Sequence, residues 1–295
     1  MNIASIAVAV DFSDHARHAA DRAAMLSAEQ RAQLDLVHVI SGSSLDRLHN
    51  WLGAPADAEV RLRDAAERDL NDMAKDIAGK RNIAARALVK TGHVVKEILS
   101  SSESSDLLVL GAHGRNPMRD LILGTTAERL LRTSKRPVLV TKRPPQALYE
   151  HVLVPVDFSL YSASALAMAR QIAPNSRITI VHAFRVPFEG RLRIAGATDE
   201  AIQKYCEEER QESVKHIKEL IRNSDDGASR ISYAVEHGGA SRVILAKEEE
   251  LSADLIVIGK HGRSMVEEWL LGSVTRHVLA DSKCDVLVVH ERALR

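Results

Sequence analysis

The chain has 295 residues, about twice the length of one typical domain, so its length predicts two domains. Its 40 Lys and Arg residues balance 40 Asp and Glu residues, and this zero net charge argues against a dedicated nucleic-acid binder, which needs a basic surplus. A hydrophobic content of 45% is ordinary for a globular protein and excludes wholesale disorder.

The start of the chain and its cysteines indicate a cellular compartment. Residues 3–10 form an apolar run with no basic start and no cleavage pattern after it, so we interpret them as a first strand and not as an export signal. Uncharged apolar runs such as residues 107–112 are far shorter than the ~20 residues of a membrane span. The two cysteines, Cys206 and Cys284, fit a reducing environment. These features predict a soluble cytoplasmic protein.

Short apolar runs and helices alternate through the first half of the chain. Ser13 can cap a helix that starts near His15 and that carries an alanine-rich stripe at helical spacing, typical of a face buried against a sheet. The strands expected in this half are residues 3–10, 34–40, 84–90, 107–111 and 137–141, and the later helices are 59–77, 94–100 and 125–132.

The second half repeats the first in the same order. Residues 8–13 (Val-Ala-Val-Asp-Phe-Ser) return as Val-Pro-Val-Asp-Phe-Ser at 154–159, and Gly-Ala-His-Gly at 111–114 returns as Gly-Lys-His-Gly at 259–262. The repeat is far longer than the ~20–50 residues of solenoid repeats, so it indicates a duplicated domain. The strands expected here are residues 152–156, 178–183, 231–236, 255–259 and 284–289.

Apolar strands separated by helices predict a parallel sheet covered on both faces, so each half is expected to be an open, doubly wound α/β domain. Two consecutive prolines, Pro144 and Pro145, interrupt any regular element between the halves. We place the domains at 1–146 and 147–295.

One glycine pattern follows the fourth strand of both halves. The spacing is G-x2-G-x9-G-[ST], which starts at Gly111 in the first half and at Gly259 in the second. Paired glycines allow a tight turn close to a ligand, and the third glycine opens a helix whose first N–H groups can bind an anion such as phosphate. Lys260 and Arg263 add positive charge beside the second loop. The pattern therefore predicts a phosphate site at the sheet edge.

Other interpretations of these residues stay open. The glycines can serve turns alone, and Asp11 and Asp157 can either cap the following helix or accept a hydrogen bond from a nucleoside. His38 and His182 end buried strands and are expected to form hydrogen bonds within the fold. No P-loop, dinucleotide fingerprint or serine-nucleophile elbow occurs, and no cysteine or carboxylate stands at ligand spacing from the histidines, so neither a metal site nor a catalytic residue is predicted.

The repeated strand-one motif, the Val-His end of the second strand and the glycine pattern together resemble the universal stress protein family in its tandem two-domain form. The resemblance covers essentially the whole chain. It implies two Rossmann-like domains, of the adenine nucleotide alpha hydrolase-like type, each a five-stranded parallel sheet of order 3-2-1-4-5. It also implies ATP binding at the strand-end glycine loops, with Mg²⁺ or Mn²⁺ carried by the phosphates.

The resemblance assigns binding positions in each half. The first site would use Ala9, Val10, Asp11, Val39, Leu110, Gly111, Gly114, Gly124, Thr125 and Thr126. The second would use Pro155, Val156, Asp157, Ala183, Ile258, Gly259, Gly262, Arg263, Gly272, Ser273, Val274 and Thr275. The first half has Ala127 where the family usually has a hydroxyl, so one phosphate-facing hydroxyl is missing there and the second site is favoured.

These expectations describe a stress-response regulator that binds ATP and hydrolyses it slowly at most. The alternative is an interaction scaffold in which one or both sites no longer hold nucleotide. The resemblance also implies pairing through the fifth strands, residues 138–141 and 286–290, as an intrachain pseudo-dimer and in a further homodimer. Residues 42–57 and 185–200 match each other poorly and are expected to be loops beside the two sites.

Overall fold

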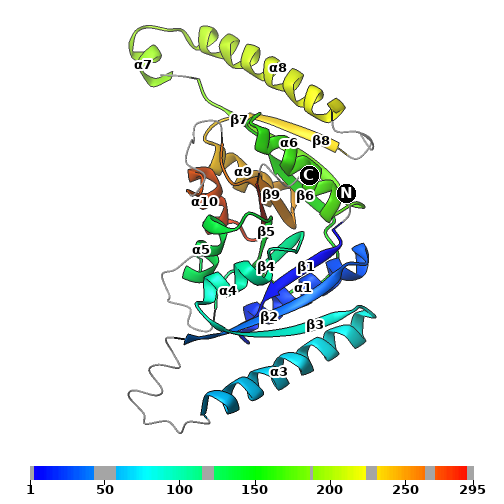
Figure 1. Ribbon diagram of the computed structural model, residues 1–295. Coiled ribbons are helices and arrows are strands. Elements are labelled where there is room, and N and C mark those ends of the chain that lie inside the picture. Colours follow the sequence, from blue (N-terminus) through cyan, green and yellow to red (C-terminus); the bar gives the residue numbers. More distant parts are fainter. Residues whose placement is uncertain are drawn as a thin grey trace. The chain divides into compact units, whose positions relative to one another are not determined.

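The computed structural model divides into two compact units, Met1–Leu148 and Tyr149–Arg295 (Figure 1). The structure describes residues 3–42, 58–114, 123–186, 189–223, 231–262 and 270–290. The proposed domain boundary after residue 146 lies close to this division. Among the described residues, no helix is long and apolar enough to cross a membrane.

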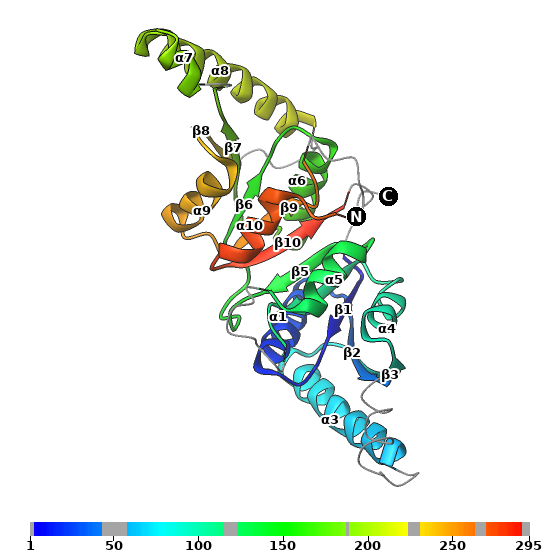
Figure 2. The same ribbon diagram turned by 90° about the vertical axis from the view of Figure 1, so that its left-hand side faces the viewer.

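The described part of unit 1 is a parallel sheet with strand order β3-β2-β1-β4-β5. The elements of unit 1 are β1 (Ser5–Ala9), α1 (Asp14–Gln30), β2 (Gln33–Ser41), α3 (Ala58–Arg81), β3 (Ala85–Gly92), α4 (Val94–Ser101), β4 (Leu107–Gly111), α5 (Thr125–Thr133) and β5 (Val138–Thr141). Helices α1 and α3 pack together on one face and α4 and α5 on the other, so α1 and α4 lie on opposite sides of β1 in Figure 2.

Unit 2 repeats this topology, with strand order β8-β7-β6-β9-β10 and parallel pairing. The elements of unit 2 are β6 (His151–Pro155), α6 (Leu160–Ile172), β7 (Arg177–Phe184), α7 (Glu189–Ile194), α8 (Asp199–Asn223), β8 (Ile231–His237), α9 (Ala240–Leu251), β9 (Leu255–Gly259), α10 (Ser273–Asp281) and β10 (Asp285–Val289). The predicted doubly wound fold, with order 3-2-1-4-5 in each half, is confirmed.

Burial of the central strands explains why their sequences are almost continuously apolar. Ile6, Ala7 and Val8 of β1 are fully buried, as are the first three residues of β4, because helices cover both faces of a parallel sheet. The alanine stripe of α1 is buried as predicted, and Ser13 caps this helix by accepting a hydrogen bond from the N–H of Ala16 at 3.2 Å. Small side chains let α1 approach the sheet closely.

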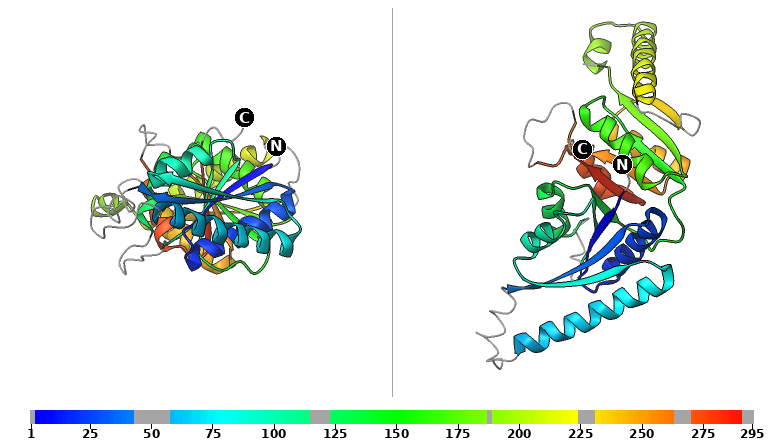
Figure 3. Two further views of the ribbon diagram at one scale, coloured as in Figure 1. Left: turned by 60° about the horizontal axis from the view of Figure 1, so that its bottom comes forward. Right: turned by 45° about the vertical axis from the view of Figure 1, so that its right-hand side comes forward.

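The long helices α3 and α8 each run beside the third strand of their own unit (Figures 1 and 3). Helix α3 extends beyond the predicted helix 59–77, because exposed charged residues continue it past its short apolar stripe. The interpretation of residues 185–200 as a loop was wrong in part, since α7 lies within it. The corresponding segment of the first half, residues 43–57, lies outside the described residues.

The first strand of each unit is fixed by a duplicated aspartate. Asp106 accepts hydrogen bonds from the N–H groups of Ala4 and Ser5 at 2.8 and 3.0 Å. Asp254 does the same for Glu150 and His151 at 2.8 and 3.2 Å. Because each aspartate stands just before the fourth strand, it sets the register of the two central strands and aligns their carboxyl ends.

A buried glutamate fixes the start of β10. The Glu248 side chain, on α9, accepts hydrogen bonds from the backbone N–H groups of Lys283 and Cys284, both at 2.7 Å. Glu248 is 6% exposed, whereas its neighbour Glu249 is exposed and forms only a surface ion pair with Lys283 at 3.4 Å. Glu248 thus serves two N–H groups that would otherwise lack an acceptor.

We predict that Glu248→Ala lowers the free energy of unfolding by about 2–4 kcal/mol, because buried hydrogen bonds to a charged group are lost. Glu249→Ala is the matched control, and its effect should stay within about 0.5 kcal/mol because its ion pair is exposed. Urea unfolding followed by circular dichroism measures both variants. Equal effects would contradict the assigned role of Glu248.

Candidate functional site

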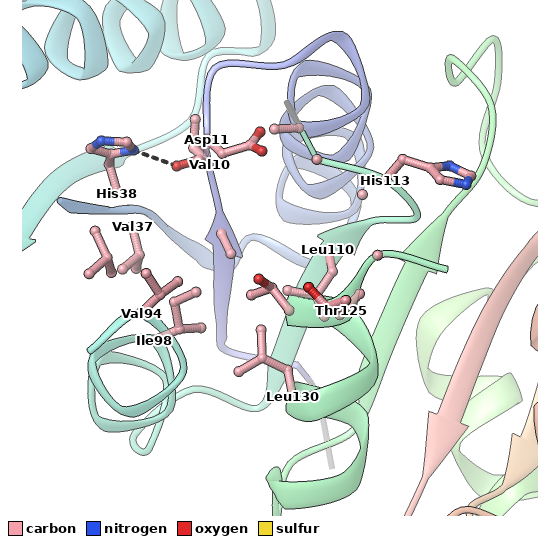
Figure 4. A pocket seen from close by; sticks show the side chains of 18 of the residues that line it. Val10, Asp11, Val37, His38, Val94, Ile98, Leu110, His113, Thr125 and Leu130 are labelled. Atoms are coloured by element: carbon pink, nitrogen blue, oxygen red, sulfur yellow. Dashed lines mark hydrogen bonds between the residues drawn. The ribbon is translucent and has the colours of Figure 1, made fainter. Parts of the chain in front are cut away.

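A pocket of about 460 Å³ opens at the carboxyl ends of β1, β2 and β4 in unit 1 (Figure 4). Carboxyl ends of parallel strands are where open α/β sheets place their ligands. Every binding position that the sequence predicts for the first half lines this pocket: Ala9, Val10, Asp11, Val39, Leu110, Gly111, Gly114, Gly124, Thr125 and Thr126. The fold therefore brings these residues together, although their role in binding stays a prediction.

The pocket has an apolar side and a polar side. Figure 4 shows Val37, Val94 and Ile98 gathered on one side, with Thr125 on the other. Thr125 and Thr126 are exposed, and both stand in the first turn of α5. An apolar wall facing a helix N-terminus suits a ligand with a flat apolar part and an anionic part.

The sequence did not point to part of the apolar wall. Val94 and Ile98 belong to α4, which packs against β2, and Leu130 belongs to α5. These residues carry no motif, and their apolar spacing matches any helix that covers a sheet. The signal that could have placed them is the topology itself, since α4 follows the strand beside β2.

The turn after β1 is built by Asp11, Phe12 and Ser13. Asp11 Oδ1 accepts hydrogen bonds from the N–H and the hydroxyl of Ser13 at 3.1 and 2.6 Å. Phe12 has a left-handed backbone (φ 61°), a strained conformation for a bulky residue that often marks functional sites. Ser13, and not Asp11, caps the helix. The Asp11 carboxylate holds Ser13 in position through these two hydrogen bonds.

The end of β2 supports this turn. His38 Nδ1 lies 2.7 Å from the carbonyl oxygen of Val10, and its ring packs on the ring of Phe12 with centroids 4.6 Å apart. The predicted hydrogen bond of His38 within the fold is therefore confirmed. Figure 4 shows this bond beside the pocket.

Unit 2 contains the same turn. Asp157 Oδ1 accepts hydrogen bonds from the N–H and hydroxyl of Ser159 at 3.1 and 2.6 Å, and Phe158 is left-handed at φ 61°. His182 Nδ1 lies 2.8 Å from the Val156 carbonyl oxygen, which confirms the second predicted histidine bond. The turn is thus a property of the repeated sequence.

The first two glycines of each motif are required by close packing. A Cβ atom on Gly111 would lie 2.8 Å from the backbone of His15, and one on Gly114 would lie 2.8 Å from Asp11 Oδ2. In unit 2 the corresponding distances are 2.6 Å from Gly259 to Tyr161 and 2.7 Å from Gly262 to Asp157. Separations this short exclude a side chain, whether or not a ligand binds.

The third glycine is less crowded in unit 1. A Cβ on Gly124 would find its nearest neighbour at 3.5 Å, an ordinary contact. The N–H of Gly124 donates to the Ala112 carbonyl oxygen at 2.9 Å, which connects the glycine loop to the start of α5. The following N–H groups of α5 have no intrahelical acceptor, because the first turn of any helix lacks one.

The hydroxyl of Thr275 has a different partner from the one expected. Thr275 is buried, and its Oγ1 donates to the carbonyl oxygen of Gly259 at 2.8 Å. This hydroxyl joins α10 to the end of β9. Ala127, at the equivalent position of unit 1, cannot form this bond, and the preference for the second site stays a prediction.

The basic residues near the second loop have unexpected surroundings. The Lys260 side chain is buried, with 3% of its surface exposed. The equivalent residue of unit 1 is Ala112. His290, which follows β10, faces the same loop: burial lowers its pKa to about 3, and the charges of Lys260 and His261 act in the same direction. The predicted site residue Arg263 lies outside the described residues.

The other predicted positions of unit 2 occupy the places equivalent to those in unit 1. Pro155 ends β6, Ala183 lies in β7, Ile258 lies in β9, and Gly272 precedes α10, where Ser273 and Val274 are the first two residues. The described residues include no group of three or more His, Cys, Asp or Glu side chains placed to hold a metal ion.

The comparisons with known proteins agree with the fold. The model of the universal stress protein family matches residues 2–142 and 148–290. A universal stress protein of Mycolicibacterium smegmatis is 25% identical, with 97% of each chain covered. Universal stress protein MJ0531 of Methanocaldococcus jannaschii is 32% identical over 50% of this chain and 85% of its own length.

The fold comparison covers both units. The crystal structure of a universal stress protein from Archaeoglobus fulgidus matches with a TM-score of 0.70 at 22% identity, covering 97% of this chain and 98% of that one. Because the family model matches each half of the chain, the chain belongs to the universal stress protein family as a tandem two-domain member.

Proposed function

We propose that this protein binds ATP at the strand-end glycine loops and acts as a nucleotide-dependent regulator in a stress response. The observation that carries the proposal is the pocket of unit 1, where every predicted binding position lines one cavity of about 460 Å³. A volume of this size lies within the ~300–1,000 Å³ usual for small-molecule sites. Membership of the family makes a nucleotide a plausible ligand.

The pocket offers a distinct environment to each part of a nucleotide. The apolar wall of Val37, Val94 and Ile98 suits the base, since aromatic rings gain from contact with buried aliphatic groups. The N-terminus of α5, with the exposed hydroxyls of Thr125 and Thr126, suits the phosphates. Asp11 Oδ2 faces the loop beside Gly114 and can accept a hydrogen bond from a ribose hydroxyl.

The same pocket gives little support for rapid hydrolysis. Asp11 is the carboxylate among its described lining residues, and its Oδ1 already accepts two hydrogen bonds from Ser13. The described lining contains no lysine or arginine to stabilise charge on a transferring phosphoryl group. We propose that any ATP hydrolysis is slow and that bound nucleotide acts through conformation or partner choice.

The alternative is a nucleotide-free scaffold. One observation favours it: packing against His15 and Asp11 already requires two glycines of the unit 1 motif without any ligand.

The cytoplasmic location, the pairing through fifth strands and a homodimer stay predictions. Light scattering of the purified chain tests the homodimer. A monomeric mass would contradict it.

We predict that freshly purified protein releases ATP when it is denatured. Chromatography identifies the nucleotide and gives the number of ATP molecules per chain. If the protein loses its nucleotide during purification, ATP with Mg²⁺ at 100-fold its dissociation constant should stabilise the native state by roughly 2.7 kcal/mol. A preparation with neither released nucleotide nor any thermal shift would support the scaffold.

Replacing Thr125 and Thr126 together by valine should weaken ATP binding by about tenfold or more, because two hydroxyl donors to charged phosphates are lost. Both side chains are exposed, so stability should change little. Thr133→Val, in the last turn of the same helix, is the matched control. Isothermal titration calorimetry measures the affinities, and equal affinity of the double variant and the control would place the phosphates elsewhere.

We also predict that Mn²⁺ binds only together with nucleotide, since the metal is proposed to be held through the phosphates. Electron paramagnetic resonance of free Mn²⁺ should show no uptake by the protein alone and uptake once ATP is added, beyond that of ATP in buffer. Tight binding of Mn²⁺ to the nucleotide-free protein would show a separate metal site.

A further inference from the structure

The two strand-end turns differ in one buried side chain of the helix that follows each of them. Unit 2 has Ser162 at the position where unit 1 has Ala16, and both residues are 3% exposed. Ala16 lines the pocket of unit 1, so this position belongs to the wall of the proposed nucleotide site. In unit 2 the exchange adds a hydroxyl next to Asp157.

The Ser162 hydroxyl bonds to Asp157 at two places. Its Oγ accepts a hydrogen bond from the backbone N–H of Asp157 at 3.1 Å and donates to the carboxylate Oδ1 of the same residue, also at 3.1 Å. One hydroxyl thus connects the main chain and the side chain of a single aspartate. Because rotation about χ1 of Asp157 would break the bond to Oδ1, the two bonds together favour one rotamer of the carboxylate.

Asp157 Oδ1 therefore accepts a third hydrogen bond, beside those from the N–H and hydroxyl of Ser159 at 3.1 and 2.6 Å. In unit 1 Ser13 supplies the equivalent two bonds, and Ala16 has no hydroxyl to add a third. The Ser13 hydroxyl also caps α1, whereas Ser159 makes no side-chain cap bond within the described residues. The carboxylate is thus held by more of its surroundings in unit 2.

The backbone of the two turns is otherwise alike. Phe12 and Phe158 are both left-handed at φ 61°. Asp157 Oδ2 lies 2.7 Å from a Cβ placed on Gly262, so it faces the glycine loop as its counterpart in unit 1 does. The chain therefore contains two versions of one turn, with and without the additional hydroxyl.

We propose that Ser162 is a positioning residue, which fixes the Asp157 carboxylate so that Oδ2 is oriented to accept a hydrogen bond from a ribose hydroxyl. Unit 2 therefore discriminates nucleotides that carry ribose hydroxyls from those that lack them more strongly than unit 1 does. A carboxylate that is already oriented loses less conformational freedom on binding, and a ligand without these hydroxyls gains nothing from the orientation. The proposal rests on the proposed function, because the ribose belongs to the proposed nucleotide.

Site-resolved titrations test this discrimination. ATP and a dideoxy ATP, which lacks both ribose hydroxyls, are titrated with Mg²⁺ into the full chain, and the NMR amide signals of Gly111 and Gly259 report the two units separately. The dissociation constant of dideoxy ATP divided by that of ATP should be larger at Gly259 than at Gly111, by about threefold or more. Equal ratios in the two units would contradict the proposal.

Two reciprocal variants isolate the hydroxyl. Ser162→Ala copies unit 1 and should lower the ratio at Gly259 by about threefold or more, while Ala16→Ser copies unit 2 and should raise the ratio at Gly111. A loss of packing alone would weaken both nucleotides equally and leave the ratio unchanged. If one variant does not fold, the other still decides, and an unchanged ratio in a folded variant would overturn the proposal.

Ser164→Ala is the matched control. Ser164 lies two residues further along α6 and is 2% exposed, and its hydroxyl donates to the carbonyl oxygen of Leu160 at 3.4 Å. Because this bond lies within the helix, the variant should leave the ratio at Gly259 unchanged. A ratio lowered as much as in Ser162→Ala would show that any buried polar change in α6 has this effect, against the assigned role of Ser162.

A measurement without ligand separates this proposal from the proposed function. Three-bond couplings from Asp157 Cγ to its backbone nitrogen and carbonyl carbon report the rotamers about χ1. They should indicate one rotamer in the wild-type chain and averaging between rotamers in Ser162→Ala. Unchanged couplings in that variant would refute the positioning role. If ATP binds to neither unit, the proposed function fails, and the couplings alone confirm or refute the positioning of Asp157.

Discussion

Each unit depends on a three-residue turn in which an aspartate accepts two hydrogen bonds from a serine. The bonds from Ser13 to Asp11 Oδ1 hold Phe12 in a left-handed conformation that it would seldom adopt alone. The turn redirects the chain from the central strand into α1, and it sets the other carboxylate oxygen against Gly114. Strand, helix and glycine loop meet at this carboxylate, so the shape of the pocket follows from it.

The two units share this turn and its packing but differ in the side chains around it. The turn, its supporting histidine and the packing of the first two glycines are the same in both units within a few tenths of an ångström. Around them, Ala112 corresponds to Lys260, Ala127 to Thr275 and His15 to Tyr161. None of these exchanges disturbs the sheet, because each side chain lies beyond the strand ends. One chain can therefore carry two strand-end turns of the same geometry with different side chains around them.

Much of the fold could be predicted from the sequence, because its signals are local or repeated. Apolar strands, the alanine stripe of α1 and the duplicated motifs indicate parallel sheets, and the resemblance supplies the strand order. The wall formed by Val94 and Ile98 could not be foreseen, since it arises when α4 packs over β2. The partner of Thr275 could not be foreseen either, because a hydroxyl at a helix start can face inward or outward, and only packing decides.

The crowding around the glycines also bears on how such motifs are read in other sequences. Gly111 and Gly114 would persist in a relative that had lost its ligand, because the helix start and the aspartate leave no room for a larger residue. Gly124 has room for a Cβ, so packing alone does not preserve it. In unit 1 the fold therefore requires the paired glycines and not the third, whereas in unit 2 a Cβ on Gly272 would lie 3.1 Å from the Lys260 carbonyl oxygen, so packing restricts the third glycine as well. The paired glycines alone are therefore no evidence of a ligand when they occur in another sequence.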